Sequence, residues 1–259
     1  MNWSRSSKLA LALVLVVLAT AVPAAAVSVS GDAPDTVKVG TQTSTTFTIT
    51  EPFDEYEQWT LRGHTELTQV NWQVTTYDNA DNQVEEQTFT GQSFSYQLSA
   101  DSGVVRVEVK LVGTPAPVED WSYDPPQEIE YVTFQQAQEG GATDNLTSMM
   151  ARPYTEDSQA ARTAIDEAKA VIERARSAGI TVEGAASDLQ DAIEFFNNGN
   201  FEQARENAEE ARTKARNALQ SQQTTNLLLL VAGVVVVLVL VAAGIWWYLN
   251  QRETYDRLG

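Results

Sequence analysis

An apolar run of 23 residues without a charged side chain, from Leu227 to Leu249, constrains this chain more than any other feature. As an α-helix the run would extend about 35 Å, at roughly 1.5 Å per residue, which is enough to cross the hydrocarbon core of a bilayer. Trp246, Trp247 and Tyr248 close the run, and such amphipathic rings favour the membrane interface. We therefore predict a transmembrane helix over 227–249. A buried core helix is the alternative, which the length and uniformity of the run disfavour.

The chain begins with the pattern of a secretory signal peptide. Arg5 and Lys8 precede a 14-residue apolar run, and Pro-Ala-Ala-Ala at 23–26 ends it before the chain turns polar. Cleavage after Ala26 fits this pattern, and an uncleaved anchor is the alternative. Together the two apolar runs predict a single-pass cell-membrane protein, with its N-terminal domain extracellular and residues 250–259 as a cytoplasmic tail.

The composition excludes several kinds of site. Cysteine is absent, which excludes disulfides, zinc–thiolate clusters and thiol catalysis. The single histidine, His64, excludes any triad or metal site that needs two imidazoles. The formal net charge of −18 argues against nucleic acid as a partner.

The acidic side chains are concentrated between the two apolar runs. Residues 27–226 contain 33 acidic and 13 basic side chains, and lysine is scarce. An acidic, lysine-poor chain without disulfides resembles the surface proteins of salt-loving archaea, whose carboxylates hold water at molar salt, where the screening length is only about 3 Å. The resemblance implies a halophilic, solvated surface. A calcium or polycation site is the alternative.

Residues 27–137 alternate between apolar and polar side chains, which is typical of half-buried strands. Turn residues separate the alternating runs, as in Asp-Asn-Ala-Asp-Asn at 78–82. About seven strands at this spacing predict an immunoglobulin-like β-sandwich. The alternating apolar residues are Val37 and Val39; Phe47 and Ile49; Val70, Trp72 and Val74; Phe94, Tyr96 and Leu98; Val105, Val107, Val109 and Leu111; and Ile129 and Tyr131.

The same segment resembles a known group of modules. Trp72 in VNWQV, the Asn/Asp-rich hairpin, SFSYQL, and Gly103 before VVRVEVKLV together resemble the second half of a PKD-type or fibronectin-like module. TVKVG and TTFTIT are similar to the opening strands of archaeal surface immunoglobulin-like repeats. The resemblance implies a tryptophan in the core between two sheets, and a spacer or adhesive role.

Candidate sites in this segment are few. The turn at 78–82 brings carboxylates and amides together as a calcium loop does, but a plain hairpin turn is the favoured interpretation. His64 lies near Glu66, so a weak acid/base pair competes with a solvent-facing loop histidine. GQSFS at 91–95 differs from a nucleophile elbow in its last residue. Four aromatic residues near turns either form a carbohydrate or partner face or pack in the core: Tyr56, Trp59, Trp121 and Tyr123.

Residues 138–155 are predicted to be a linker. They open with Glu-Gly-Gly-Ala-Thr and contain the sequon Asn145-Leu146-Thr147, so we predict a glycoprotein with Asn145 as the acceptor.

After Thr155 the apolar period changes to 3.6, which predicts helices over 156–220 as an antiparallel hairpin or three-helix stalk. Alanines at steps of three and four form a narrow seam in the last helix, which continues from Phe201 towards Tyr248. The spacing of Ala192, Phe195, Gly199, Phe201, Ala204 and Ala211 resembles a single tetratricopeptide-like hairpin. That resemblance implies partner binding, and a plain stalk is the favoured alternative.

The predicted architecture is thus multi-domain β plus α: sandwich, linker, helical stalk and one transmembrane helix. We expect a membrane-anchored extracellular protein of structural or adhesive function, whose partner is a protein or a surface glycan. The alternative is an accessory subunit of a membrane transport or secretion complex that binds through the helical hairpin. A hydrolase built on two distant carboxylates is the third hypothesis. No catalytic residue, cofactor or metal is predicted.

Overall fold

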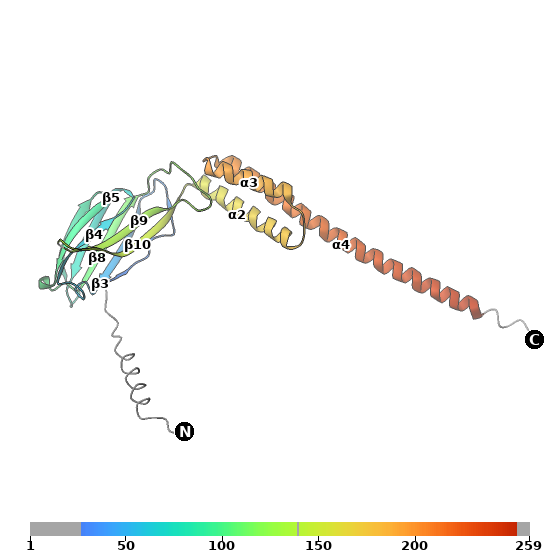
Figure 1. Cartoon of the computed structure of the whole chain (residues 1–259), viewed down its shortest axis with the longest axis horizontal. Helices are drawn as coiled ribbons and strands as arrows, with labels where there is room; N and C mark the ends of the chain where they lie inside the picture. Colours follow the sequence, from blue (N-terminus) through green and yellow to red (C-terminus); the bar gives the residue numbers. More distant parts are fainter. Residues whose placement is uncertain (1–26, 139, 253–259) are drawn as a thin grey trace, which may run out of the picture. The chain divides into compact units, whose positions relative to one another are not determined.

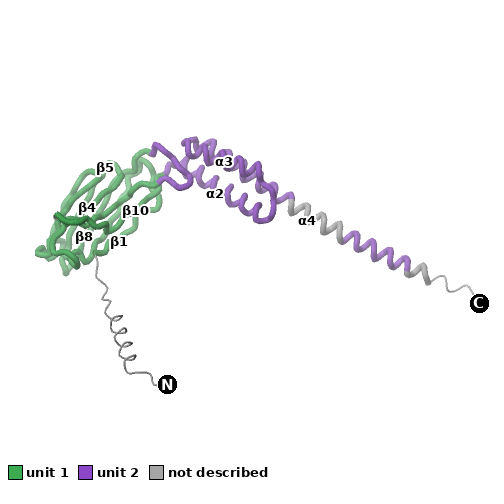
Figure 2. The backbone as a smooth tube through the Cα atoms, viewed as in Figure 1, with its two compact units in different colours: residues 1–117, 128–153 green, residues 118–127, 154–259 purple. Residues whose placement is uncertain are grey.

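The computed structural model in Figure 1 describes residues 27–138 and 140–252, apart from the side chains of 222–233 and 248–252. The predicted signal peptide at 1–26 lies outside the described residues, as do residues 253–259 of the predicted tail. The chain divides into two compact units, and Figure 2 shows that neither is a continuous stretch. One unit contains residues 1–117 and 128–153, and the other contains residues 118–127 and 154–259.

The first unit contains two five-stranded sheets. The first sheet has the strand order β1-β3-β8-β5-β6, and the second has the order β2-β10-β9-β4-β7. The strands are β1 (Ser28–Ser30), β2 (Thr36–Lys38), β3 (Thr43–Thr50), β4 (Gln58–His64), β5 (Thr68–Tyr77), β6 (Gln83–Thr90), β7 (Ser93–Ser99), β8 (Arg106–Thr114), β9 (Ile129–Ala137) and β10 (Thr143–Tyr154). A short 3₁₀ helix, η1 (Ala100–Ser102), joins β7 to β8.

Alternation along the strands builds the core between the sheets. In the first sheet, β8 pairs antiparallel with β3 and β5, so Val109 lies beside both Phe47 and Val74. All three side chains are buried. The predicted sandwich is therefore found, with more strands than expected. Strand β6 was not predicted, because nearly all of its side chains are exposed and its sequence does not alternate between apolar and polar residues.

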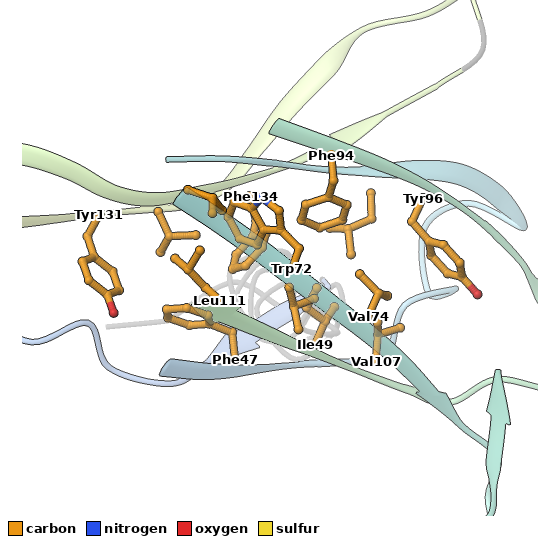
Figure 3. Packing of buried hydrophobic residues seen from close by; sticks show 14 of the residues in the cluster. Phe47, Ile49, Trp72, Val74, Phe94, Tyr96, Val107, Leu111, Tyr131 and Phe134 are labelled. Atoms are coloured by element: carbon orange, nitrogen blue, oxygen red, sulfur yellow. The ribbon is translucent and has the colours of Figure 1, made fainter. Parts of the chain in front are cut away.

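Aromatic rings from both sheets meet at the centre of this core (Figure 3). The ring of Trp72, on β5, lies with its centroid 4.9 Å from Phe94 and 6.3 Å from Phe134, both on the second sheet. Phe134 also meets Phe47 of β3 edge-on, at 5.3 Å. Burial of each such ring stabilises the fold by about 1.5–3 kcal/mol. The tryptophan predicted to lie between the sheets does so.

Residues that the sequence assigns to a linker form the last strand of the sandwich. Strand β10 pairs antiparallel with β9 from Thr143 to Ala151. Bulges interrupt the register between Asn145 and Thr147 and again between Met149 and Met150. These bulges disturb the period-two pattern, which explains why local sequence does not predict a strand here.

The second unit contains three helices: α2 (Glu156–Ser177), α3 (Glu183–Asn197) and α4 (Phe201–Arg252). Helix α2 begins at the predicted place, because Thr155 and Ser158 exchange the two hydrogen bonds of a capping box. The predicted alanine seam is buried where α4 packs against both other helices. Its members are Ala204, Ala208, Ala211 and Ala215.

The segment 118–127, between β8 and β9, also belongs to the helical unit. Trp121 meets Phe201 edge-on, with ring centroids 5.0 Å apart. The guanidinium of Arg162, on α2, donates to the backbone carbonyls of Ser122 and Tyr123. The Tyr123 hydroxyl donates to Asp166, and burial followed by this carboxylate raises the pKa of Tyr123. Of the four aromatic residues considered as a partner face, Trp121 and Tyr123 thus pack in the helical unit, and Trp59 is buried in the sandwich.

Helix α4 contains the segment that the sequence predicts to cross a membrane. Among the described residues, no helix has both the length and the apolar character that a crossing needs.

This finding overturns the transmembrane helix predicted over 227–249. The single-pass membrane localisation, with the two ends of the chain on opposite sides, rested on that helix and is corrected with it. The lipid bilayer as a partner stays a prediction. The membrane-interface role of Trp246, Trp247 and Tyr248 stays a prediction. The first two are exposed on α4, and the side chain of Tyr248 lies outside the described residues.

Gly63 tests how tightly the sandwich core is packed. A Cβ atom at this position would lie 2.2 Å from Cε1 of the Phe94 ring, which faces Gly63 across β4 and β7. We expect Gly63→Ala to lower the free energy of unfolding by about 1–3 kcal/mol, since a buried ring cannot move aside freely. Urea denaturation followed by near-ultraviolet circular dichroism measures this change.

Gly184→Ala is the matched control, because a Cβ there meets nothing within 4 Å. It lies in helix α3, so the substitution should be neutral or stabilise by up to about 1 kcal/mol. Equal stability of both variants would contradict the close packing at Gly63.

Because of Tyr96, we expect the free energy of unfolding of the sandwich to fall as the pH rises in the alkaline range. The Tyr96 hydroxyl donates to the Glu85 carboxylate on β6 at 2.8 Å, and burial, then this carboxylate, raise the pKa of Tyr96 from 10.0 to about 12. The neutral phenol is therefore favoured in the folded state. Its contribution to stability is complete below pH 10 and is lost as the pH rises towards about 12.

Denaturation midpoints of the wild type and of Tyr96→Phe, measured along this alkaline range, test the effect. The wild type should lose more stability than the variant, because Tyr96→Phe removes the titrating group. Parallel pH profiles would show that Tyr96 does not carry this dependence.

Candidate functional site

The outer face of the second sheet carries a polar surface that strand β4 positions. Along β4 the side chains of Trp59 and Leu61 are buried, whereas those of Arg62 and His64 are exposed. Because successive residues of a strand point to opposite faces, Arg62 and His64 share the outer face. Each has a neighbour on both sides, from β7 and from β9.

His64 lies in the first of two rows of polar residues that cross the sheet. Its neighbours in register are Ser93 on β7 and Thr133 on β9. His64 Nδ1 shares a hydrogen bond of 2.9 Å with the Ser93 hydroxyl. On the other side, Thr133 Oγ1 donates to Ser148 of β10 at 2.9 Å.

The carboxylate that reaches His64 belongs to Glu130, not to Glu66. His64 Nε2 lies 4.0 Å from Glu130 Oε1. Glu66 instead accepts a hydrogen bond of 2.6 Å from the backbone N–H of Glu130. The acid/base pair considered from the sequence is therefore replaced by a Ser93–His64–Glu130 series.

This series has the residue types of a catalytic triad but not its geometry. In a triad the carboxylate hydrogen-bonds the imidazole and orients it against the nucleophile. At 4.0 Å the Glu130 oxygen is beyond hydrogen-bond distance from Nε2. The arrangement therefore brings a serine, a histidine and a carboxylate together without the carboxylate–imidazole hydrogen bond of a triad.

Arg62 lies in the second row, between Ser95 of β7 and Gln135 of β9. Its side chain makes no hydrogen bond or ion pair with any described residue. Its guanidinium, with five N–H donors in a planar fork, is exposed and free to bind. The next residue in this row is Asn145 of β10, the predicted glycosylation acceptor, which is exposed on the strand.

These residues line one open recess of about 450 Å³, which we call the sheet recess. The lining is mostly hydroxyl, amide and charged groups: Arg62, His64, Ser93, Ser95, Glu130, Thr133 and Gln135, with Gly63 and Phe94 between them. A guanidinium, a carboxylate and an imidazole thus converge on one solvent-facing surface with neutral hydroxyls between them. Such a surface can donate and accept several hydrogen bonds at once.

Among these residues the sequence singled out His64, and it considered Ser93 and Ser95 only as parts of the GQSFS run. The period-two pattern of β4 could have placed Arg62 on the same face. Ser93 and Glu130 come from strands distant in sequence, so only the strand register brings them to His64.

The turn at 78–82 is held by its own hydrogen bonds. Asp78 accepts from the backbone N–H groups of Ala80 and Asn82 and from the Asn82 side chain, and these bonds, the side-chain one above all, lower the pKa of Asp78. Its carboxylate is therefore committed to the turn. In the described part of the chain, no group of three or more His, Cys, Asp or Glu is placed to hold a metal ion.

A second recess lies in the helical unit, between α2 and α4. This helical groove has a volume of about 510 Å³. Ala160 and Ala164 contribute small side chains to it, while Arg205 and an Arg212–Glu167 ion pair line its side.

Comparisons with known proteins assign no family. No protein-family model matches the chain, and no curated protein matches it. Among solved structures, the chain is similar to a mutant of the SrpA adhesin from Streptococcus sanguinis, with 13% sequence identity and a TM-score of 0.27. The match covers 52% of this chain and 62% of the adhesin chain, which is less than two thirds of its length. A similarity at this level carries no argument about function.

The hydrogen bond between Ser93 and His64 predicts which imidazole nitrogen carries the proton. An N–H dipole directed at a carboxylate is favourable, so we expect the proton on Nε2, towards Glu130, with Ser93 donating to Nδ1. Ser93→Ala removes the donor at Nδ1 and should raise the share of the Nδ1–H tautomer. Imidazole ¹⁵N chemical shifts measure this share.

Ser95→Ala is the control, because Ser95 lies in the neighbouring row and faces Arg62. It should leave the tautomer unchanged. An unchanged tautomer in Ser93→Ala as well would show that Ser93 does not orient the ring.

Proposed function

We propose that this protein is a non-enzymatic binding protein of structural or adhesive type, and that the sheet recess is its contact surface. The supporting observation is that Arg62 and Glu130 face one recess without forming an ion pair with each other. Two opposite charges that lie close together in a protein usually form an ion pair. Exposed charged groups that line one recess without such a pair are available to bind a partner. The partner is a protein or a glycan.

The geometry supports binding rather than catalysis. The Ser93–His64–Glu130 series lacks the carboxylate–imidazole hydrogen bond that nucleophilic catalysis needs. The recess is open to solvent on a regular sheet, and Arg62 and His64 in it are exposed. The net charge of −18 disfavours nucleic acid as the partner.

A second candidate function places the contact on the helical unit. The helical groove favours it, because small alanines beside Arg205 leave room for a partner segment between α2 and α4. In that case the protein would be an accessory subunit of a larger complex.

Paired variants of the full chain distinguish the two surfaces. We expect Arg62→Ala with Glu130→Ala to abolish capture of a partner from cross-linked cells of the source, because both charged contacts are lost. Arg205→Ala with Glu209→Ala in the helical groove should leave capture unchanged. Mass spectrometry of the captured material measures the result.

The reverse outcome would contradict the proposed contact surface and favour the helical groove. Circular dichroism of both variants serves as the folding control. All four positions are outside the buried core, so both variants should keep the wild-type spectrum.

A further inference from the structure

We infer that the sheet recess is a subsite for a neutral sugar, with Arg62 donating to and Glu130 accepting from its hydroxyl groups. This inference rests on the proposed function and names the chemical class of the ligand. It is carried by the charges of the recess, by the neutral groups between them and by the spacing of the strands.

The two charged groups act as opposite hydrogen-bonding ends. Arg62 has donors only, and an ionised Glu130 has acceptors only. The two lie on neighbouring strands, Arg62 beside Gln135 of β9 and Glu130 towards His64. Within the described residues, Arg62 has no partner, and the Glu130 carboxylate has only the imidazole at 4.0 Å. A ligand that fills the recess must therefore offer acceptors at one end and donors at the other.

The middle of the recess is neutral. Ser93, Ser95 and Thr133 contribute hydroxyls, and Gln135 contributes an amide. Ser95 and Gln135 can both donate and accept hydrogen bonds. The Ser93 hydroxyl is bonded to His64 and the Thr133 hydroxyl donates to Ser148, so these two retain lone pairs as acceptors. The ligand therefore needs several groups of the same dual character close together, and the hydroxyls of a sugar ring have that character.

A charged ligand fits this recess less well. An anion at Arg62 would approach Glu130 and a chain of net charge −18. A cation at Glu130 would leave the Arg62 guanidinium and the neutral groups without a role. A neutral sugar satisfies both ends by hydrogen bonds to charged groups, which are stronger than bonds between neutral groups.

The dimensions of the strand surface also suit one sugar ring. Residues on the same face of a strand are about 6.7 Å apart, and neighbouring strands are about 4.8 Å apart. Arg62 and His64 are thus separated by about the width of one hexose, and the Glu130 side chain, from a backbone position level with Glu66, reaches to 4.0 Å from His64 Nε2. The ring would lie flat on the sheet, with its hydroxyls directed at the row residues.

Calorimetric titration of the full chain with methyl glycosides of glucose, galactose, mannose and N-acetylglucosamine tests the inference. Glucuronate and glucosamine serve as the anionic and cationic counterparts. We expect at least one neutral glycoside to bind, and neither charged sugar to bind more tightly. The affinity for the neutral glycoside should change less than about twofold between roughly 0.1 and 1 M salt, because the ligand carries no charge. Over this range the screening length falls from about 10 to 3 Å.

The variants assign the binding to the recess. Arg62→Gln and Glu130→Gln should each weaken it about tenfold or more, since each removes a hydrogen bond to a charged group. The matched controls are Lys110→Gln and Glu86→Gln, which make the same charge changes at exposed positions of the first sheet. Both controls should bind as the wild type does.

Failure of every neutral glycoside to bind, tighter binding of a charged sugar, or equal affinity in the recess variants would overturn the inference. The proposed function has a separate test, because partner capture is measured without any sugar. Capture that is lost in the recess variants while no glycoside binds would leave the proposed function standing and remove only the sugar.

Discussion

Strand β4 contributes side chains both to the core of the sandwich and to the sheet recess, and the arrangement of the recess depends on this double role. Trp59, Leu61 and Gly63 face the core, while Arg62 and His64 face solvent. A shift of one residue in register would exchange the two sets and bury two polar side chains. The close fit of Phe94 against Gly63 opposes such a shift. Core packing therefore determines where the recess residues lie.

Local patterns predicted those elements whose side chains alternate regularly. The buried runs around Trp72 and Val109 indicated strands, and the period after Thr155 indicated helices, because each pattern records which face is buried. The sequences of strand β6 and of the bulged strand β10 show no such regular pattern. The run at 227–249 shows the converse, since apolar character alone predicted a membrane span that the described residues do not support. The assignment to a PKD-type module and to a salt-loving source stays a prediction.

The candidate site could be predicted only in part. His64 was visible because it is the single histidine of the chain. Ser93 is 29 residues away, and its hydrogen bond to His64 depends on how β4 and β7 pair. Register between strands is a non-local property that a single sequence does not display. The glycosylation of Asn145 stays a prediction as well, although the structure places this side chain exposed in the row of Arg62.

The helical unit is formed by two separate stretches of the chain, because it includes the segment 118–127. This segment leaves the sandwich after β8, supplies Trp121 and Tyr123 to the aromatic cluster with Phe196 and Phe201, and returns as β9. A recombination event that moved residues 154–259 into another gene would transfer half of this cluster without the other half. Residues 154–259 alone would therefore lack Trp121 and Tyr123, whose rings pack against Phe201 and Phe196.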